Sequence, residues 1–296
     1  MKQSGIVVAA YGRQYRVELD GGPTQLCDAR GKRGGLVCGD RVTVLQTASG
    51  VQGVIVAHEP RGSLFYRSDV SRQKLIAANV TQVIIVVATE PPFSDELVTR
   101  CTVAAEAQNI AVLIVLNKCD LGDRLGAAIA VLEPFVRLGY RVLRISARSD
   151  GARQLLPMLA GETSLLIGQS GMGKSTLINA LVPGARAATR EISQALHSGR
   201  HTTTCSHLYR PAPACALIDS PGLTDFGLRH LTVEEIAAAF VEFRPLADQC
   251  RFRDCHHHRE PDCRIRLALE EGNIDPRRYA AFLLLCSEAA QRNSSR

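Results

Sequence analysis

Residues 168–175 read Gly-Gln-Ser-Gly-Met-Gly-Lys-Ser, with the spacing G-x-x-x-x-G-K-S. The apolar run 165–167 precedes this stretch as a buried strand would, and the run 176–181 after it is compatible with a helix. A glycine loop between a strand and a helix points successive backbone N–H groups and the helix dipole at one place, which suits a phosphate group. The stretch therefore predicts a nucleotide-phosphate site on an α/β fold, because a ligand-free glycine turn would need neither the Lys-Ser pair nor these flanks.

Each position of this stretch and the threonine after it is a predicted nucleotide-binding residue. Lys174 would reach the β- and γ-phosphates and act in catalysis, and the Ser175 hydroxyl would ligate Mg²⁺. The complete predicted set is Gly168, Gln169, Ser170, Gly171, Met172, Gly173, Lys174, Ser175 and Thr176.

Composition predicts a folded protein of two or three domains, with 296 residues, 46% hydrophobic and 22% charged. No apolar run approaches the roughly 20 residues of a membrane span. The first five residues do not resemble a signal peptide. We therefore expect a protein without membrane association in a reducing cytoplasm. We also expect a monomer. The 10 cysteines would there be thiols or metal ligands.

Residues 1–62 carry short β-branched runs separated by glycines, at 5–8, 15–19, 41–45 and 53–56. This spacing predicts a closed barrel of about five strands, and the OB-fold is the commonest barrel of that kind. Residues 1–74 contain 11 Lys and Arg against 6 Asp and Glu. The surplus is compatible with a face for nucleic acid, although charge alone leaves an ordinary solvated surface equally open.

Residues 63–230 change character, because the apolar runs 83–87 and 112–116 do not alternate with polar residues. Such runs indicate strands buried on both faces, and helix-compatible stretches lie between them. Strands that alternate with helices predict a doubly wound α/β sheet.

Two short motifs follow the predicted strands and suit a guanine base. Asp120, in Asn117-Lys118-Cys119-Asp120, would accept from the N1–H and the exocyclic amine of guanine, a donor pair that adenine lacks. Asn117 would bridge loops and the Lys118 stem would pack on the base. Ser146 and Ala147 would offer backbone N–H groups to guanine O6. At the carboxyl ends of parallel strands, these elements favour GTP over an ATP-using kinase.

A third group of residues suits Mg²⁺ and the γ-phosphate. Asp219, in Asp219-Ser220-Pro221-Gly222, would hold Mg²⁺ through water, and the Gly222 N–H would sense the γ-phosphate. The threonine-rich stretch 199–204 would add a hydroxyl to Mg²⁺, and its spacing does not separate Thr202 from Thr203.

The order of these elements is unusual, because the base-reading motifs precede the phosphate loop. The same sheet forms if the two termini of an ordinary GTPase domain are joined and the chain is cut at another place. Proteins tolerate such a permutation because their termini usually lie close together at the surface. We therefore predict a circularly permuted P-loop GTPase domain. The chain beyond Gly222 then runs directly into the C-terminal region.

Residues 231–296 contain the spacing Cys250-x4-Cys255-x-His257-x5-Cys263. Three thiolates and one imidazole complete a tetrahedral structural Zn²⁺ shell with no open position for catalysis. The neighbours His256 and His258 remain alternatives to His257 on spacing alone. We expect one Zn²⁺ in a mainly α-helical domain.

The chain resembles the RsgA (YjeQ) family of bacterial ribosome-biogenesis GTPases. The resemblance rests on the permuted order, the stretch 168–181, Asn117-Lys118-Cys119-Asp120, the threonine-rich stretch, Asp219–Gly222 and the cysteine-histidine tail. The resemblance covers nearly the whole chain, although the long basic N-terminal extension of some members is absent. It implies an OB-fold, a permuted GTPase domain and a zinc-binding domain. It also implies a role in late maturation of the small ribosomal subunit, binding to its rRNA, and GTP hydrolysis that the subunit stimulates.

The resemblance also points to His201 as the catalytic water-positioning residue and to Thr203 as the threonine ligand of Mg²⁺. Position 223, where Ras-like enzymes carry a water-orienting Gln, is Leu. A nucleotide-gated RNA-binding module in which hydrolysis is incidental remains the alternative function.

Overall fold

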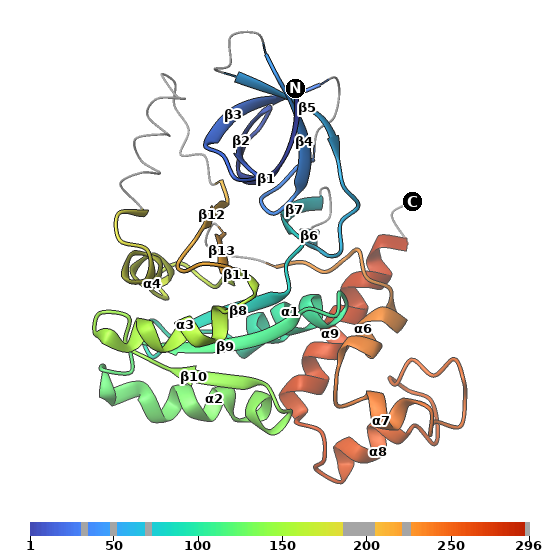
Figure 1. Ribbon diagram of the computed structural model, residues 1–296. Helices are drawn as coiled ribbons and strands as arrows, with labels where there is room; N and C mark the ends of the chain where they lie inside the picture. The colour runs from blue at the N-terminus through green and yellow to red at the C-terminus, as the bar shows by residue number, and fades with distance from the viewer. Residues whose placement is uncertain (31–34, 48–51, 69–72, 186–204, 221–225, 294–296) are drawn as a thin grey trace.

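The computed structural model describes residues 1–30, 35–47, 52–68, 73–185, 205–220 and 226–293. Figure 1 shows a small barrel above an α/β sheet, with the C-terminal helices beside that sheet. Within the described ranges, no helix combines the length and the apolar character that a membrane span needs.

The barrel is built by the first five strands, as the sequence predicts. β1 pairs with both β2 and β4, which closes the sheet on itself, and β3 pairs in parallel with β5. Burial alternates along β2 and along the first part of β4, so that Tyr15, Val17 and Val44 are buried inside the barrel. The third strand has no counterpart among the predicted runs. The strands are β1 (Lys2–Tyr11), β2 (Gln14–Leu19), β3 (Thr24–Ala29), β4 (Arg41–Gln46) and β5 (Gln52–His58).

A parallel sheet forms the centre of the molecule, in the order β10-β9-β8-β11-β13. Six of the seven residues of β8 are buried, which explains why its sequence does not alternate. Its strands are β8 (Gln82–Ala88), β9 (Ala111–Asn117), β10 (Arg141–Arg144), β11 (Thr163–Ile167) and β13 (Ala216–Asp219).

Helices cover both faces of this sheet, which confirms the doubly wound prediction. One face packs on α1 (Asp95–Glu106) and α2 (Leu125–Arg137). The other face packs on α3 (Leu156–Leu159) and α4 (Lys174–Leu181). Two 3₁₀ turns, η1 (Gly122–Arg124) and η2 (Asp150–Leu155), lead into α2 and α3.

A short strand, β12 (His207–Tyr209), joins the barrel to the parallel sheet. It pairs antiparallel with β13 on one side and with β1 of the barrel on the other. The barrel and the α/β sheet are therefore one continuous sheet of 11 strands.

A second connection between the barrel and the sheet runs through the hairpin β6 (Leu64–Ser68) and β7 (Gln73–Ala78). Asp40, which is fully buried, accepts from Arg61 Nε at 2.7 Å and Arg61 Nη2 at 2.8 Å just before this hairpin. The bidentate pair fixes the chain where it leaves the barrel.

The C-terminal region is helical and shares its core with the α/β sheet. α6 begins at a capping box formed by Thr232 and Glu235. The helices are α6 (Val233–Ala239), α7 (Arg244–Ala247), α8 (Arg264–Glu270) and α9 (Pro276–Asn293).

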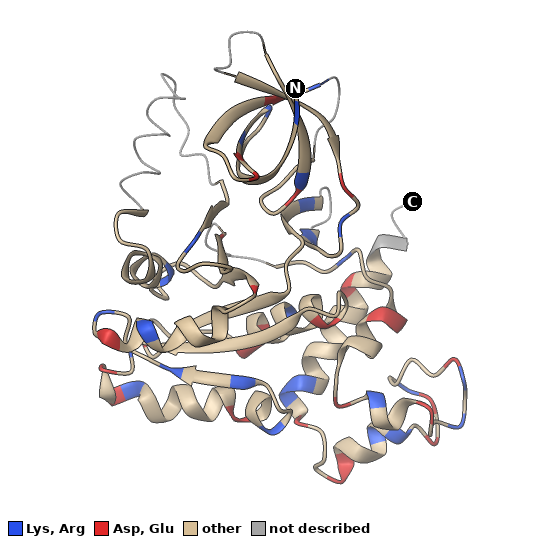
Figure 2. Cartoon of the chain, viewed as in Figure 1, with Lys and Arg blue, Asp and Glu red and all other residues tan. Residues whose placement is uncertain are grey.

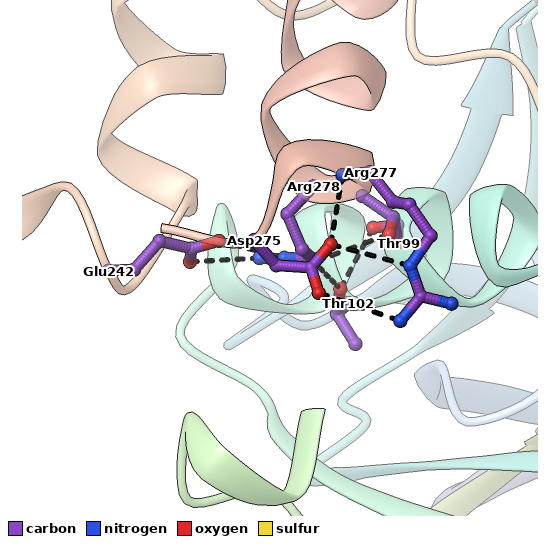
Figure 3. Close-up of polar contacts among 6 residues, drawn as sticks. All are labelled: Thr99, Thr102, Glu242, Asp275, Arg277 and Arg278. Carbon is purple, nitrogen blue, oxygen red and sulfur yellow. Dashed lines mark hydrogen bonds and ion pairs between the residues drawn. The ribbon is translucent and has the colours of Figure 1, made fainter. Parts of the chain in front are cut away.

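Two buried arginines fix α9 to α1. Arg278 of α9 donates to both carboxylate oxygens of Glu242, at 2.8 and 2.9 Å, and lies beside Thr99 and Thr102 of α1 (Figure 3). Arg100 of α1 forms a bidentate pair with Glu288 of α9, at 2.8 and 2.5 Å. The GTPase sheet and the C-terminal region are thus held together by charged groups that are largely shielded from water.

Candidate functional site

The phosphate loop lies between β11 and α4, as the sequence predicts. Gly168 and Gly173 have φ angles of 150° and 91°, which favour glycine. A Cβ at Gly168 would lie 2.2 Å from the Val86 carbonyl oxygen, and one at Gly173 would lie 2.3 Å from Asn117 Nδ2. Both positions therefore require glycine for conformation and for space.

Lys174 is the first residue of α4 and is only 8% exposed. Its Nζ donates to the carbonyl oxygens of Gly168 at 2.6 Å and Gln169 at 2.9 Å. Burial lowers the pKa of Lys174, and the nearby Asp219 carboxylate opposes this shift. The ammonium is thus held inside the curve of the loop, where a phosphate oxygen could replace the two carbonyls.

Asn117 connects three loops at the end of β9 and is 2% exposed. Its Nδ2 donates to the Met172 carbonyl oxygen at 2.9 Å, and its Oδ1 accepts from the Ala147 N–H at 2.9 Å. The phosphate loop and the stretch after β10 are therefore aligned by a single side chain.

Asp120 and Lys118 face the same space from the loop that follows β9. Ser146 Oγ donates to Asp120 Oδ1 at 2.5 Å. This hydrogen bond lowers the pKa of Asp120, so the carboxylate is ionised at neutral pH. Lys118 Nζ donates to the Glu90 carbonyl oxygen at 2.6 Å, which stretches its aliphatic stem along the site.

These residues line a cavity of about 540 Å³. The predicted residues on its wall are Asn117, Lys118, Asp120, Ser146, Ala147, Ser170, Gly171, Gly173, Lys174, Ser175, Thr176 and Asp219. Gly168, Gln169 and Met172 support the loop through their backbones instead.

Sequence reasoning missed three residues of the cavity wall, Leu121, Arg148 and Ser220. Each follows a predicted residue directly, so extending each motif by one position would have found them. His201, Thr202, Thr203 and Gly222 lie outside the described residues, and their predicted roles stay predictions.

The cysteine-histidine tail brings four side chains together around one point. The ligand atoms of Cys250, Cys255, His257 and Cys263 all lie within 4.8 Å of one another. Nδ1 of His257 is 3.5 Å from the sulfurs of Cys250 and Cys263, which are 4.0 Å apart. Sulfur ligands on a tetrahedral metal with bonds of about 2.3 Å are about 3.8 Å apart, so the group could hold a metal ion.

The structure also separates the three neighbouring histidines. His257 is 5% exposed, and Tyr279 Oη donates to its carbonyl oxygen at 2.7 Å. His256 and His258 are exposed. Of the three neighbouring histidines, His257 is therefore the one that lies in this cluster.

Comparison with known proteins gives consistent matches over the chain. Residues 58–229 match the family model described as RsgA GTPase. A relative from Nitrosomonas europaea is 52% identical over 94% of this chain and 89% of its own length. One from Burkholderia pseudomallei is 51% identical over 98% and 93%. Both are named small ribosomal subunit biogenesis GTPase RsgA.

Two solved structures share the fold. YjeQ from Thermotoga maritima has a TM-score of 0.77 at 30% identity, covering 98% of this chain and 99% of that one. YloQ, described as a circularly permuted GTPase, has a TM-score of 0.73 at 24% identity, covering 99% and 96%. Together with the cavity, these findings define a circularly permuted P-loop GTPase, an enzyme that hydrolyses GTP.

Within that class, the chain belongs to the RsgA GTPase family.

Proposed function

We propose that this GTPase acts in late maturation of the small ribosomal subunit. It binds the rRNA of the subunit in its GTP form and leaves after hydrolysis that the subunit stimulates. The observation that supports this role is the identity of 51–52% with relatives named for small-subunit biogenesis, over nearly the whole chain. The cavity supports it too, because it presents base-reading and phosphate-binding groups on one wall.

The base end of the cavity selects guanine through Asp120. With Ser146 Oγ on Oδ1, the ionised carboxylate keeps acceptor capacity for the guanine N1–H and amine. Asn117 positions this region relative to the phosphate loop, and the Lys118 stem packs on one face of the base.

The phosphate end binds the β- and γ-phosphates through the loop N–H groups and Lys174. When these phosphates enter, Lys174 Nζ exchanges the Gly168 and Gln169 carbonyls for phosphate oxygens. Ser175 and Asp219 would hold Mg²⁺, which would supply positive charge to the transferred phosphoryl group. Thr203 would add a hydroxyl ligand to Mg²⁺, Gly222 would sense the γ-phosphate and His201 would orient the attacking water.

The cysteine-histidine cluster holds one structural Zn²⁺. Three sulfurs and one nitrogen at tetrahedral spacing suit Zn²⁺ and leave no position for substrate. An ion held by these four residues would cross-link residues 250–263 next to the Phe243 ring, whose centroid is 6.0 Å from that of the His257 ring.

Three parts share the work in a cytoplasmic monomer. Residues 1–62, the OB-fold, contact rRNA; residues 63–230 bind and hydrolyse GTP; residues 231–296 hold zinc. Figure 2 shows Lys and Arg positions in blue and Asp and Glu positions in red, and both colours occur in the barrel. Individual Lys and Arg residues of the barrel would contact the RNA backbone.

GTP hydrolysis with and without purified small ribosomal subunits tests this function. We expect slow intrinsic hydrolysis and a large increase with small subunits, absent with large subunits as the control. Equal rates under all three conditions would refute the proposal. Unchanged release of a His201→Ala variant from subunits would instead favour an RNA-binding module in which hydrolysis is incidental.

A further inference from the structure

The barrel reaches the nucleotide cavity through one row of residues across the sheet. In β12, His207 is paired with Ala9 of the barrel strand β1 on one side. On the other side it is paired with Asp219, the last residue of β13, which lines the cavity. A residue of the barrel is thus two strands away from the predicted Mg²⁺ ligand.

The barrel also contacts Ser206, just before β12, and His207, the first residue of β12. Cys38 is 1% exposed, and its Sγ lies 3.0 Å from the Ser206 carbonyl oxygen and 3.3 Å from that of Val8. Burial raises the pKa of Cys38, so the thiol keeps its proton and can donate to either carbonyl. The Tyr11 ring packs on His207, with centroids 5.8 Å apart.

An ion pair holds the far end of β12. Arg210, the residue after the strand, donates to Glu18 Oε1 of β2 through Nε at 3.1 Å and Nη2 at 2.6 Å. Both side chains are partly exposed, at 42% and 34%. The pair can therefore be altered without opening the protein core.

We propose that the barrel is a positioning element for GTP hydrolysis, with Glu18 and Arg210 as positioning residues that fix β12 and thereby Asp219. β12 has only three residues, so its place is set by its neighbours rather than by its own length. A shift of the barrel on its RNA would move β12 through the paired backbones, because packed sheets transmit displacement. This inference rests on the proposed function and names the route by which the subunit stimulates hydrolysis.

Charge reversal tests the route in the full chain. Glu18→Arg and Arg210→Glu each place like charges together, and the double variant restores an opposite pair with its direction reversed. Asp20→Arg is the matched control: it makes the same charge change in the barrel at the partly exposed Asp20–Arg41 pair, 2.6 Å apart, which does not involve β12. Hydrolysis is measured at increasing small-subunit concentration, which separates the maximal rate from the half-saturating concentration.

We expect each single reversal to lower the maximal stimulated rate roughly two- to fivefold, the effect of one exposed ion pair. The double variant should recover most of the loss, and Asp20→Arg should alter only the half-saturating concentration.

Wild-type maximal rates in both single variants would overturn the inference, as would a double variant no better than the singles. If small subunits do not stimulate GTP hydrolysis by the wild-type protein, the proposed function is refuted, and the positioning role of the barrel with it. This outcome is distinguishable because it is seen with the wild-type protein alone.

Discussion

Replacing Glu242 with Gln should destabilise the protein by about 3–5 kcal/mol, because it leaves a buried guanidinium without its counter-charge. The side chains of Arg278 and Glu242 are only 3% and 6% exposed. The Arg278 Cζ lies 4.6 Å from the centroid of the Phe240 ring and 5.3 Å from that of Phe135. Figure 3 shows Thr99 and Thr102 on the same guanidinium, at 3.4 and 3.5 Å, but these hydroxyls are neutral and cannot replace the carboxylate.

Thermal unfolding followed by circular dichroism measures this effect. A loss of this size should lower the melting temperature by roughly 5–8 °C. Glu133→Gln, at the exposed Glu133–Arg137 pair of α2, is the matched control and should leave the melting temperature unchanged. Replacing both partners, Glu242→Leu with Arg278→Met, should recover most of the loss, because apolar side chains of similar size remove the desolvation cost of both charges. A Glu242→Gln protein as stable as the control would refute the reasoning.

Three further predictions concern the nucleotide and metal sites. Asp120→Asn should weaken GTP binding and favour xanthosine triphosphate in a competition assay, because xanthine presents an acceptor where guanine presents an amine; unchanged preference for GTP would count against base reading by this carboxylate. Lys174→Ala should lower the rate of phosphate release by at least about a hundredfold, and near-normal release would exclude a catalytic role for this ammonium. Cys255→Ser should lose the single zinc found by elemental analysis and expose residues 250–263 to protease, whereas zinc-free wild-type protein with a protease-resistant tail would contradict the metal assignment.

Short motifs made the nucleotide cavity predictable. Each motif is local, and the carboxyl ends of parallel strands must meet at one edge, so the residues after β9, β10, β11 and β13 gather there. In the structure, Asn117, Asp120 and Ser146 line the cavity at this edge of the sheet. The choice of His257 over its two neighbours needed the fold, because spacing treats the three alike and burial separates them.

Contacts between distant segments were not predictable. Nothing in the sequence near Ala9 or His207 indicates that their strands pair, since each edge could accept many partners. The same holds for Asp40 with Arg61 and for Glu242 with Arg278, because ion pairs carry no periodic pattern. Of these contacts, the β1–β12 pairing joins the barrel to the GTPase sheet, whereas the two ion pairs stabilise the barrel exit and the C-terminal region.

Co-sedimentation with small ribosomal subunits in two nucleotide states tests the central claim most directly. The bound fraction is measured with a non-hydrolysable GTP analogue and with GDP, each across a salt series. We predict tight binding with the analogue and weak binding with GDP, with affinity falling steeply as salt rises because RNA contacts release counterions. Equal affinity in the two nucleotide states would contradict the account, since the γ-phosphate would then not control binding to the subunit.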